Sequence, residues 1–253
     1  MTGTLRVYLA GMVMLERDDV LVTEERLAGP QGRVAFAMLA AERAPVSKDA
    51  IADELWSGEP PPAWEVALRA LISKVRAAIA QVELDGESLA HAFGCYQLKL
   101  PPETWVDIEV AADAVHRAET ALEKEDLDGA MGWSLAANAI ARRGFLPGED
   151  GRWVAQRRAD LHDVHVRALE CRTHVQLVRE QYGPASRDAE RVIALEPFRE
   201  SGYRLLMSAH SGAGNRAEAL RAYERCRMTL ADELGAGPSV ETESLYLEIL
   251  RSD

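Results

Sequence analysis

The apolar pattern of residues 196–250 constrains the fold more than any other part of the chain. Apolar side chains recur there at spacings of three and four residues, which places them on one face of a helix. Gly214 and Gly235 follow two of these periodic stretches, as expected of residues that end helices. Asn215 and Ser239 precede the next two stretches, and we expect their side chains to cap helices. The segment therefore predicts a helical hairpin followed by a closing helix.

Four positions also recur 34 residues further along the chain. They are Ala185, Ala189, Val192 and Pro197, which return as Ala219, Tyr223, Cys226 and Ala231. A period of about 34 residues is typical of tetratricopeptide helix pairs, in which small residues let the two helices approach closely. The alternative is an ordinary helical bundle whose register agrees by chance. We expect the repeat, because the predicted loops also fall at matching places.

The N-terminal hundred residues predict a different set of elements. Alternating apolar residues such as Leu5 and Val7 predict antiparallel strands within residues 4–23. Three helices are expected at about 34–43, 47–56 (capped by Ser47) and 63–80, followed by short strands at 89–92 and 96–100. Strands, three helices and a terminal hairpin make up a winged helix-turn-helix. The chain is therefore predicted to be mainly α, with a winged helix-turn-helix domain in residues 1–103 and an all-α, tetratricopeptide-like domain in residues 104–253.

The third of these helices carries a core stripe and a polar side. Its expected core residues are Val66, Ala67, Leu71, Val75, Ala78 and Ile79. Its polar residues are Arg69, Ser73, Lys74 and Arg76. Spacings of three and four residues bring side chains to the same side of a helix, so we expect the polar residues to face outward together.

Several short motifs resemble those of one known family. They are Glu196-Pro197-x-Arg199-Glu200, Arg204-Leu205-Leu206-Met207, Ala217-Glu218-Ala219-Leu220, Tyr223 and Glu233-Leu234-Gly235. Together they resemble the bacterial transcriptional activator domain of the antibiotic regulatory proteins of Streptomyces and related actinobacteria. The segments WSGEPP at 56–61 and SKVR at 73–76 resemble the same regulators. In that family the helical domain follows an OmpR-type winged helix, which agrees with the predicted order of domains.

The resemblance implies a cytoplasmic activator of a secondary-metabolite gene cluster. Its partners are then double-stranded DNA, bound at direct repeats in a promoter by a homodimer, and RNA polymerase including its sigma factor. The third helix would enter the major groove, and the terminal hairpin would reach phosphates or the minor groove. The candidate DNA-binding residues are Arg69, Ser73, Lys74 and Arg76 on the helix, Lys99 on the hairpin, and Arg33 and Lys48 near two helix starts.

The charge of the chain keeps a second hypothesis open. The net charge is −12, and residues 1–110 hold 10 Lys and Arg against 17 Asp and Glu. Surfaces that bind DNA are usually basic, because neutralising phosphates supplies most of the nonspecific affinity. Members of the family often carry polar or cationic residues where this chain has Val66, Leu71 and Ala77. The alternative is an interaction protein with degenerate DNA binding that acts through a protein partner.

Other functional classes have little support in the sequence. No apolar stretch approaches the roughly 18 residues that predict a membrane-spanning helix, so no membrane partner is expected. A metal hypothesis is invited by His162, His165 and His174 with Cys171, but no Asp, Glu or Cys completes a recognisable spacing. The three cysteines, Cys95, Cys171 and Cys226, are far apart and in no metal spacing. A phosphate-binding glycine loop and a nucleophile elbow are both missing. We therefore expect no metal, no cofactor and no catalytic residues.

Overall fold

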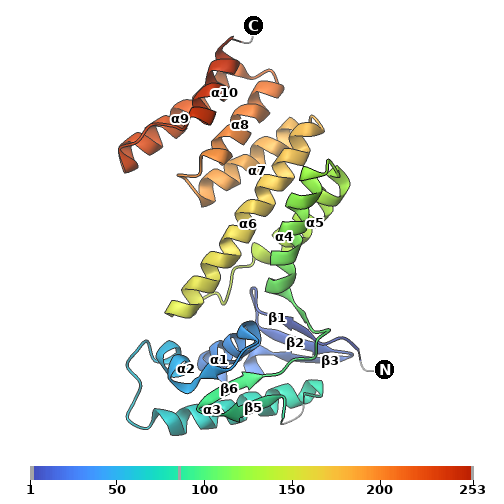
Figure 1. The fold of residues 1–253 in the computed structure, drawn as a ribbon, viewed down its shortest axis with the longest axis vertical. Coiled ribbons are helices and arrows are strands. Elements are labelled where there is room, and N and C mark those ends of the chain that lie inside the picture. Colours follow the sequence, from blue (N-terminus) through green and yellow to red (C-terminus); the bar gives the residue numbers. More distant parts are fainter. Residues whose placement is uncertain (1–2, 85–86, 252–253) are drawn as a thin grey trace. The chain divides into compact units, whose positions relative to one another are not determined.

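The computed structural model describes residues 3–84 and 87–251. Its contacts divide the chain into two compact units, Met1–Ala112 with Ile140–His162 and Asp113–Ala139 with Asp163–Asp253. Helices α4 (Asp107–Glu123), α5 (Leu127–Ala141) and α6 (Arg152–Val178) each contribute residues to both units (Figure 1). Each unit therefore combines two segments that are distant in the sequence. The predicted boundary between residues 103 and 104 stays a prediction.

The first unit begins with a small sheet. The elements before α4 are β1 (Arg6–Tyr8), β2 (Met14–Arg17), β3 (Val20–Thr23), η1 (Glu24–Arg26), α1 (Gly29–Glu42), β4 (Val46–Ser47), α2 (Lys48–Leu55), α3 (Trp64–Ile79), η2 (Ala80–Val82), β5 (Leu89–Ala92), β6 (Cys95–Leu98) and β7 (Trp105–Val106). The first sheet has the order β3-β2-β1-β7, with β1 antiparallel to β2 and parallel to β7. Val7, Leu15 and Val22 face one another in register and are fully buried. The strands expected within residues 4–23 are confirmed.

Helices α2 and α3 both pack against α1. Residues Val34 to Ala40 of α1 are all buried, because the helix has α2 and α3 on its sides. Helix α2 starts where the sequence predicts, since the Ser47 hydroxyl accepts a hydrogen bond from the Ala50 N–H at 3.1 Å. A second sheet has the order β4-β6-β5 and ends in the β5–β6 hairpin. The expected winged helix-turn-helix is confirmed.

The turn of this hairpin has an unusual residue. Ala92 pairs with Cys95, so Phe93 and Gly94 alone form the connection. Both have positive φ, 50° at Phe93 and 75° at Gly94, as a type I′ turn requires. Asparagine or aspartate usually occupies the first of these positions, since a bulky side chain is disfavoured there.

The first turn of α6 is held within the first unit by two acidic side chains. The Glu54 carboxylate on α2 accepts hydrogen bonds from the backbone N–H groups of Trp153 at 2.9 Å and Val154 at 3.0 Å. The indole N–H of Trp153 donates to Glu42 at the end of α1. A carboxylate suits this position, because the first N–H groups of a helix lack partners and carry a partial positive charge.

The second unit contains the predicted helical repeat. Its last four helices are α7 (Tyr182–Leu195), α8 (Glu200–Gly212), α9 (Arg216–Leu234) and α10 (Val240–Arg251). Each packs against the next in sequence, and Tyr203, Leu206 and Met207 lie in their shared core. Gly202 allows a close approach of α8 to α7, since a Cβ there would lie 2.9 Å from the Val192 Cγ1 atom. The all-α, tetratricopeptide-like fold is confirmed.

Three of the four repeated positions have equivalent environments. The buried ones are Ala185, Ala189 and Val192 in α7 and Ala219, Tyr223 and Cys226 in α9. The fourth match is wrong, because Pro197 lies in a loop whereas Ala231 is an exposed residue of α9. Helix α9 has 19 residues and α7 has 14, so α9 continues where the chain after α7 has already entered a loop. The correspondence between the two segments therefore ends after the third position.

One of the expected helix caps also differs from prediction. Asn215 stands at the start of α9, but its side chain makes no capping hydrogen bond. Ser239 precedes α10, and its hydroxyl donates to Glu200 on α8 at 2.8 Å. The side chain of Ser239 thus joins α10 to α8, and a hydrogen bond to an ionised carboxylate is stronger than one between neutral groups.

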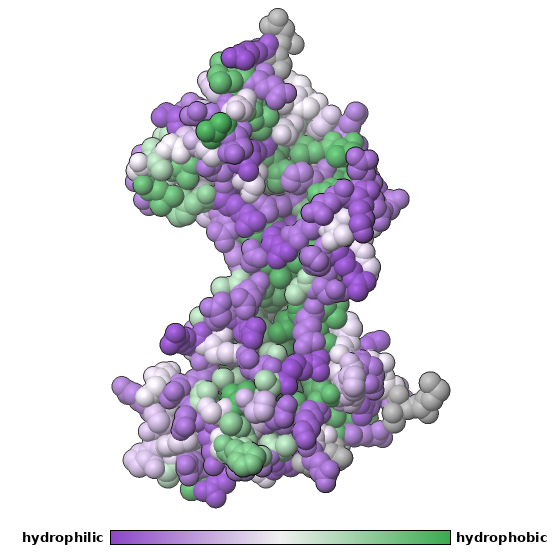
Figure 2. Space-filling view, in the orientation of Figure 1, coloured by the Kyte–Doolittle hydropathy of each residue, from purple (hydrophilic) through white to green (hydrophobic). Residues whose placement is uncertain are grey.

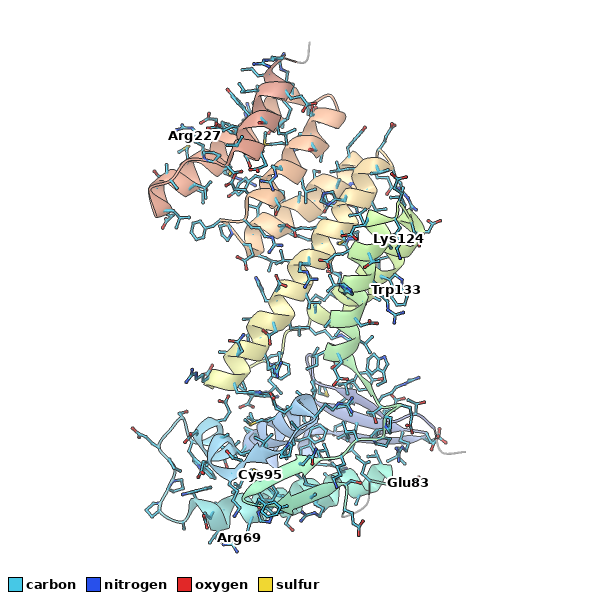
Figure 3. The ribbon with its side chains drawn as sticks, in the orientation of Figure 1. Arg69, Glu83, Cys95, Lys124, Trp133 and Arg227 are labelled. Atoms are coloured by element: carbon cyan, nitrogen blue, oxygen red, sulfur yellow. The ribbon has the colours of Figure 1, made fainter. Side chains whose placement is uncertain are left out.

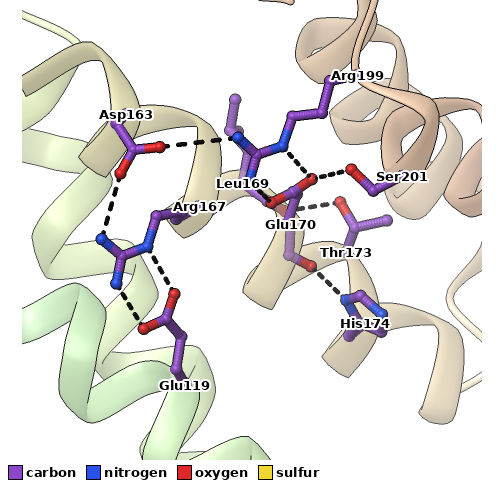
Figure 4. A network of polar contacts seen from close by, with 9 residues as sticks. All are labelled: Glu119, Asp163, Arg167, Leu169, Glu170, Thr173, His174, Arg199 and Ser201. Carbon is purple, nitrogen blue, oxygen red and sulfur yellow. Dashed lines mark hydrogen bonds and ion pairs between the residues drawn. The ribbon is translucent and has the colours of Figure 1, made fainter. Parts of the chain in front are cut away.

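A network of charged side chains holds α4, α6 and α8 together in the second unit (Figure 4). Arg167 binds both carboxylate oxygens of Glu119 at 2.7 and 2.6 Å. Arg199 binds Glu170 in the same two-pronged way at 2.8 Å for each bond. The hydrogen bonds from Arg167 hold the pKa of Glu119 below its ordinary value despite partial burial. Such pairs are directional, so they fix how the helices face one another.

Other general features of the described chain concern its surface, its buried thiols and its helix lengths. Figure 2 shows hydrophilic side chains spread over the visible face, with hydrophobic patches between them. Cys171 and Cys226 are buried, and burial raises the pKa of these thiols to about 12 and about 11. Within the described residues, no helix is both long and apolar enough to cross a bilayer. No group of three His, Cys, Asp or Glu in that part of the chain could hold a metal ion.

Candidate nucleic-acid interface

Helix α3 presents one row of side chains to the core and another to solvent. Its buried row consists of Leu68, Ile72, Val75 and Ile79, at spacings of four, three and four residues. The sequence placed Val66 and Ala67 in this core, and that prediction is wrong. Val66 has 61% of its surface exposed and Ala67 is exposed as well. Leu68 and Ile72 were missed because the apolar residues of this helix extend around most of its circumference.

Three of the predicted polar residues do reach solvent on α3. Arg69, Ser73 and Lys74 are exposed. Figure 3 shows the Arg69 side chain pointing away from the helix bundle of its unit. Its Nε–H makes a long contact of 3.4 Å to the carbonyl of Glu65, one turn earlier in the same helix. These side chains are therefore available to a molecule outside the fold.

Arg76, the fourth predicted residue, has a structural contact instead. It is half-buried, and its guanidinium donates to the carbonyl of Leu89 at 2.9 Å. Its Nε–H is buried without a hydrogen-bond partner among the described residues. Burial raises the pKa of Tyr96, on the neighbouring strand β6, and the positive charges of Arg69 and Arg76 oppose this. Arg76 thus joins α3 to the hairpin, and fewer of its N–H donors are free to bind a ligand.

The hairpin and the start of α2 come together on the same unit. The Lys48 N–H donates to the carbonyl of Gly94 at 2.9 Å, so the first residue of α2 lies at the hairpin turn. Lys48 is half-buried, and Lys99 at the end of the hairpin is exposed. The side chain of Phe93 at the turn is fully exposed. Sequence reasoning missed Phe93 as a functional candidate, although its place before a turn glycine was a signal.

Arg33 does not join this group. Its guanidinium pairs with Glu24 at 3.2 Å and Glu149 at 2.9 Å, and it donates to the carbonyl of Pro147 at 2.7 Å. Only 14% of its side chain is exposed. These contacts pair the charge of Arg33 and occupy both of its terminal nitrogens, so Arg33 is not part of the interface proposed below.

The arrangement can bind a polyanion of regular shape. Exposed or half-exposed cations lie on α3 (Arg69, Lys74), at the start of α2 (Lys48) and on the hairpin (Lys99). The exposed side chains of α3 that lie between these two cations are small and weakly polar. A helix of this kind fits the major groove of B-form DNA, and a hairpin beside it can reach the backbone or the minor groove. Fold and site together define a winged-helix protein that carries a tetratricopeptide-like helical unit.

Comparison with known proteins supports this class. The model of the family described as "Bacterial transcriptional activator domain" matches residues 106–250. The chain is 30% identical over 254 residues to the regulatory protein AfsR of Streptomyces coelicolor, covering 100% of this chain and 25% of that protein. It is 27% identical over 230 residues to the regulatory protein DnrI of Streptomyces peucetius, covering 87% and 84%. The chain spans about a quarter of the length of the AfsR proteins it matches.

A solved structure agrees along nearly the whole chain. It is EmbR of Mycobacterium tuberculosis in complex with a low-affinity phosphopeptide, with a TM-score of 0.87 and 25% sequence identity. The match covers 99% of this chain and 66% of that one. The chain belongs to the bacterial transcriptional activator domain family, whose model matches more than half of it. The predicted resemblance to the antibiotic regulatory proteins of Streptomyces is confirmed.

Proposed function

We propose that this protein is a DNA-binding transcriptional regulator that places α3 in the major groove. The observation that carries the proposal is the solvent-facing group Arg69, Ser73 and Lys74 on the third helix of a winged helix-turn-helix. Arg and Lys contact phosphate or guanine, and a serine hydroxyl can bond to either a base or the backbone. Lys48 and Lys99 add phosphate contacts beside the helix.

The finer function follows from the family. The protein activates a secondary-metabolite gene cluster from the cytoplasm, as a homodimer on direct repeats in a promoter. Direct repeats place the two copies head to tail, so their contact uses two different surfaces. The helical unit then contacts RNA polymerase and its sigma factor. These finer statements extend the resemblance to the antibiotic regulatory proteins, and what supports them is that the relatives are named as regulatory proteins.

Fluorescence anisotropy tests the DNA-binding proposal. The full chain is titrated against the promoter region of its neighbouring operon, from low to physiological salt. The test variant is Arg69→Glu/Lys74→Glu, because both side chains are exposed and neither holds the fold. A matched variant, Arg221→Glu/Arg227→Glu, makes the same charge change on the exposed face of α9.

Saturable binding that the α3 variant loses and the α9 variant keeps is the expected result. Equal loss in both variants would indicate binding through net charge and would contradict a role for α3. Absence of binding by folded protein at low salt would overturn the proposal.

The acidic surface favours one alternative function. Arg33 and Arg76 bind acceptors within the first unit. Few cations of this unit are then left to bind phosphate, whereas its acidic residues are numerous and repel it. In this alternative the winged helix has lost DNA binding and the protein acts through a protein partner. A pull-down in which the partner is retained by the α3 variant would favour it.

A further inference from the structure

The outward face of α3 is apolar along its centre. Val66, Ala70, Ser73 and Ala77 follow at spacings of four, three and four residues, which makes one continuous row along the helix. All four are exposed, and Val66 has 61% of its surface in solvent. The row lies opposite the buried row that begins at Leu68. Three of its members are hydrocarbon side chains that nothing within the first unit covers.

The cations of α3 lie on either side of this row. At about 100° per residue, Arg69 falls about 70° to one side of the row and Lys74 about 70° to the other. A helix seated in the major groove turns the centre of its outward face to the base edges and its flanks to the two phosphate backbones. Arg69 and Lys74 then suit phosphates, and the apolar row faces the bases.

The chemistry of the row selects one kind of base. Guanine is read by paired hydrogen bonds from Arg or Lys, and adenine by Asn or Gln. The row holds none of these four residue types. Thymine differs from the other bases in presenting a methyl group to the major groove, and alanine and similar apolar side chains contact it. The serine hydroxyl at position 73 tolerates any base edge.

We infer that α3 recognises thymine methyl groups through Val66, Ala70 and Ala77, so that A·T pairs occupy the part of the binding site facing this helix. The inference rests on the proposed DNA binding and names the chemistry of its specificity. Polar discrimination of guanine from other bases is then weak at these positions.

The test measures how much the methyl group of each thymine contributes to binding. Binding sites are first selected from random duplexes with the full chain. In the selected duplex, thymines are then replaced one at a time by uracil, which keeps the base-pairing edge and lacks the methyl. Each thymine in contact with the row loses about one buried methyl group, so affinity should fall about fourfold at that position. Replacements outside the contacted positions serve as the internal control.

A variant connects the effect to the helix. Val66→Ala removes two methyl groups from an exposed position, and the penalty for uracil should shrink at one position only. Val240→Ala, at an exposed valine of α10, is the matched control and should leave the penalty unchanged.

Three results overturn the inference. If the protein selects no duplex at low salt, the proposed DNA binding fails and the inference fails with it. If it selects a duplex and binds uracil and thymine forms equally, only the inference fails. A uracil penalty that Val66→Ala leaves unchanged at every position also contradicts it, because the methyl contact then comes from elsewhere.

Discussion

The carboxylate of Glu54 accepts a hydrogen bond of 3.0 Å from the backbone N–H of Val154, a residue one hundred positions later in the chain. Glu54 is 8% exposed, so both partners are shielded from water. This contact, with its neighbour at Trp153, holds the first turn of α6 to the second helix of the winged-helix unit. It is one of several contacts that join Ile140–His162 to the N-terminal residues of the first unit.

Removal of this carboxylate should destabilise the first unit. Glu54→Ala leaves two N–H groups at a helix start without an acceptor, which costs about 1–3 kcal/mol for a buried group. Urea unfolding followed by circular dichroism measures the loss. Glu59→Ala, at an exposed glutamate close by in sequence, is the control. An unchanged unfolding midpoint for Glu54→Ala would contradict the role assigned to the contact.

A substitution at Gly151 tests the same contact from the other side. An alanine Cβ there would lie 2.0 Å from the Glu54 Oε1 atom, so the carboxylate must leave its two N–H partners. We expect Gly151→Ala to lose stability for two reasons: it displaces this carboxylate, and it strains the backbone, because φ at Gly151 is 156°, a value that L residues rarely adopt. Only the first loss should disappear when Glu54→Ala is already present, so the combined loss should be smaller than the sum of the two single losses. A double-mutant cycle measures this coupling. Additive losses would indicate that the two residues act independently.

Phe93→Asn should change stability and DNA binding in opposite directions. Asparagine accepts the positive φ of 50° at this turn better than phenylalanine, and it removes a fully exposed ring from water. Stability should rise by up to about 1 kcal/mol, measured as a higher unfolding midpoint. Affinity for DNA should fall, because aromatic side chains can insert between base steps in the minor groove.

Phe198→Asn, at another exposed phenylalanine, is the control for Phe93→Asn. It should leave DNA affinity as it is. If Phe93→Asn raises stability and binds DNA as tightly as before, the hairpin turn lies away from the DNA.

Acid should weaken the second unit through its buried ion pair. Burial alone would raise the pKa of Asp188, but two hydrogen bonds of 2.7 Å from Arg172 and one of 2.9 Å from Gln176 hold the pKa below its ordinary value of 3.8. Because the pKa is lower in the folded state, the stabilisation is fully present above about pH 4. It is lost as the pH falls through the lowered value.

Thermal unfolding between pH 6 and pH 2 checks this dependence. Asp188→Asn should be strongly destabilised at pH 6, by about 3–5 kcal/mol, since it leaves the Arg172 charge buried without its partner. The gap between Asp188→Asn and the unmodified protein should narrow in acid. Asp128→Asn removes an exposed carboxylate paired with Arg179 and should show little effect at any pH. A gap that widens in acid would contradict the assignment.

The salt dependence of DNA binding should report few phosphate contacts. Arg69, Lys74, Lys48 and Lys99 give four cations per protomer, so log affinity should fall against log salt with a slope of about −3.6 per protomer. Lys99→Ala should reduce the magnitude of this slope by about 0.9. Arg33→Ala should lower the unfolding temperature and leave the slope unchanged, because Arg33 pairs with Glu24 and Glu149. A slope change at Arg33 with unchanged stability would reverse the two assignments.

Local chemistry made several elements predictable. The Ser47 cap starts α2, as predicted, because a cap depends on a side chain and backbone groups within a few residues. The 34-residue repeat was visible for the same reason, since each position needs a small or apolar residue against the next helix. The exposure of Arg69, Ser73 and Lys74 on α3 was predictable, because polar residues that recur at helical spacing share one side of a helix.

Contacts over long distances were not predictable. The sequence predicts Arg33 and Arg76 as DNA contacts, but a guanidinium binds the acceptors that the fold places beside it, here Glu149 and the Leu89 carbonyl. The Ser239 hydroxyl likewise donates to Glu200 on another helix, because the fold places that carboxylate beside it. Such pairings depend on which elements pack together, and spacing along the chain carries no information about that.

The sequence by itself determined the kinds of element, their order and the family, because periodicity, turn residues and motifs depend only on residues that are close together in the chain. Only the tertiary structure decided which side of α3 faces outward. In that helix apolar residues occupy most of the circumference, so Val66 and Leu68 are equal candidates for the core in sequence. Packing against α1 and α2 buries Leu68 and leaves Val66 exposed, since a helix can press only one of its sides against its neighbours.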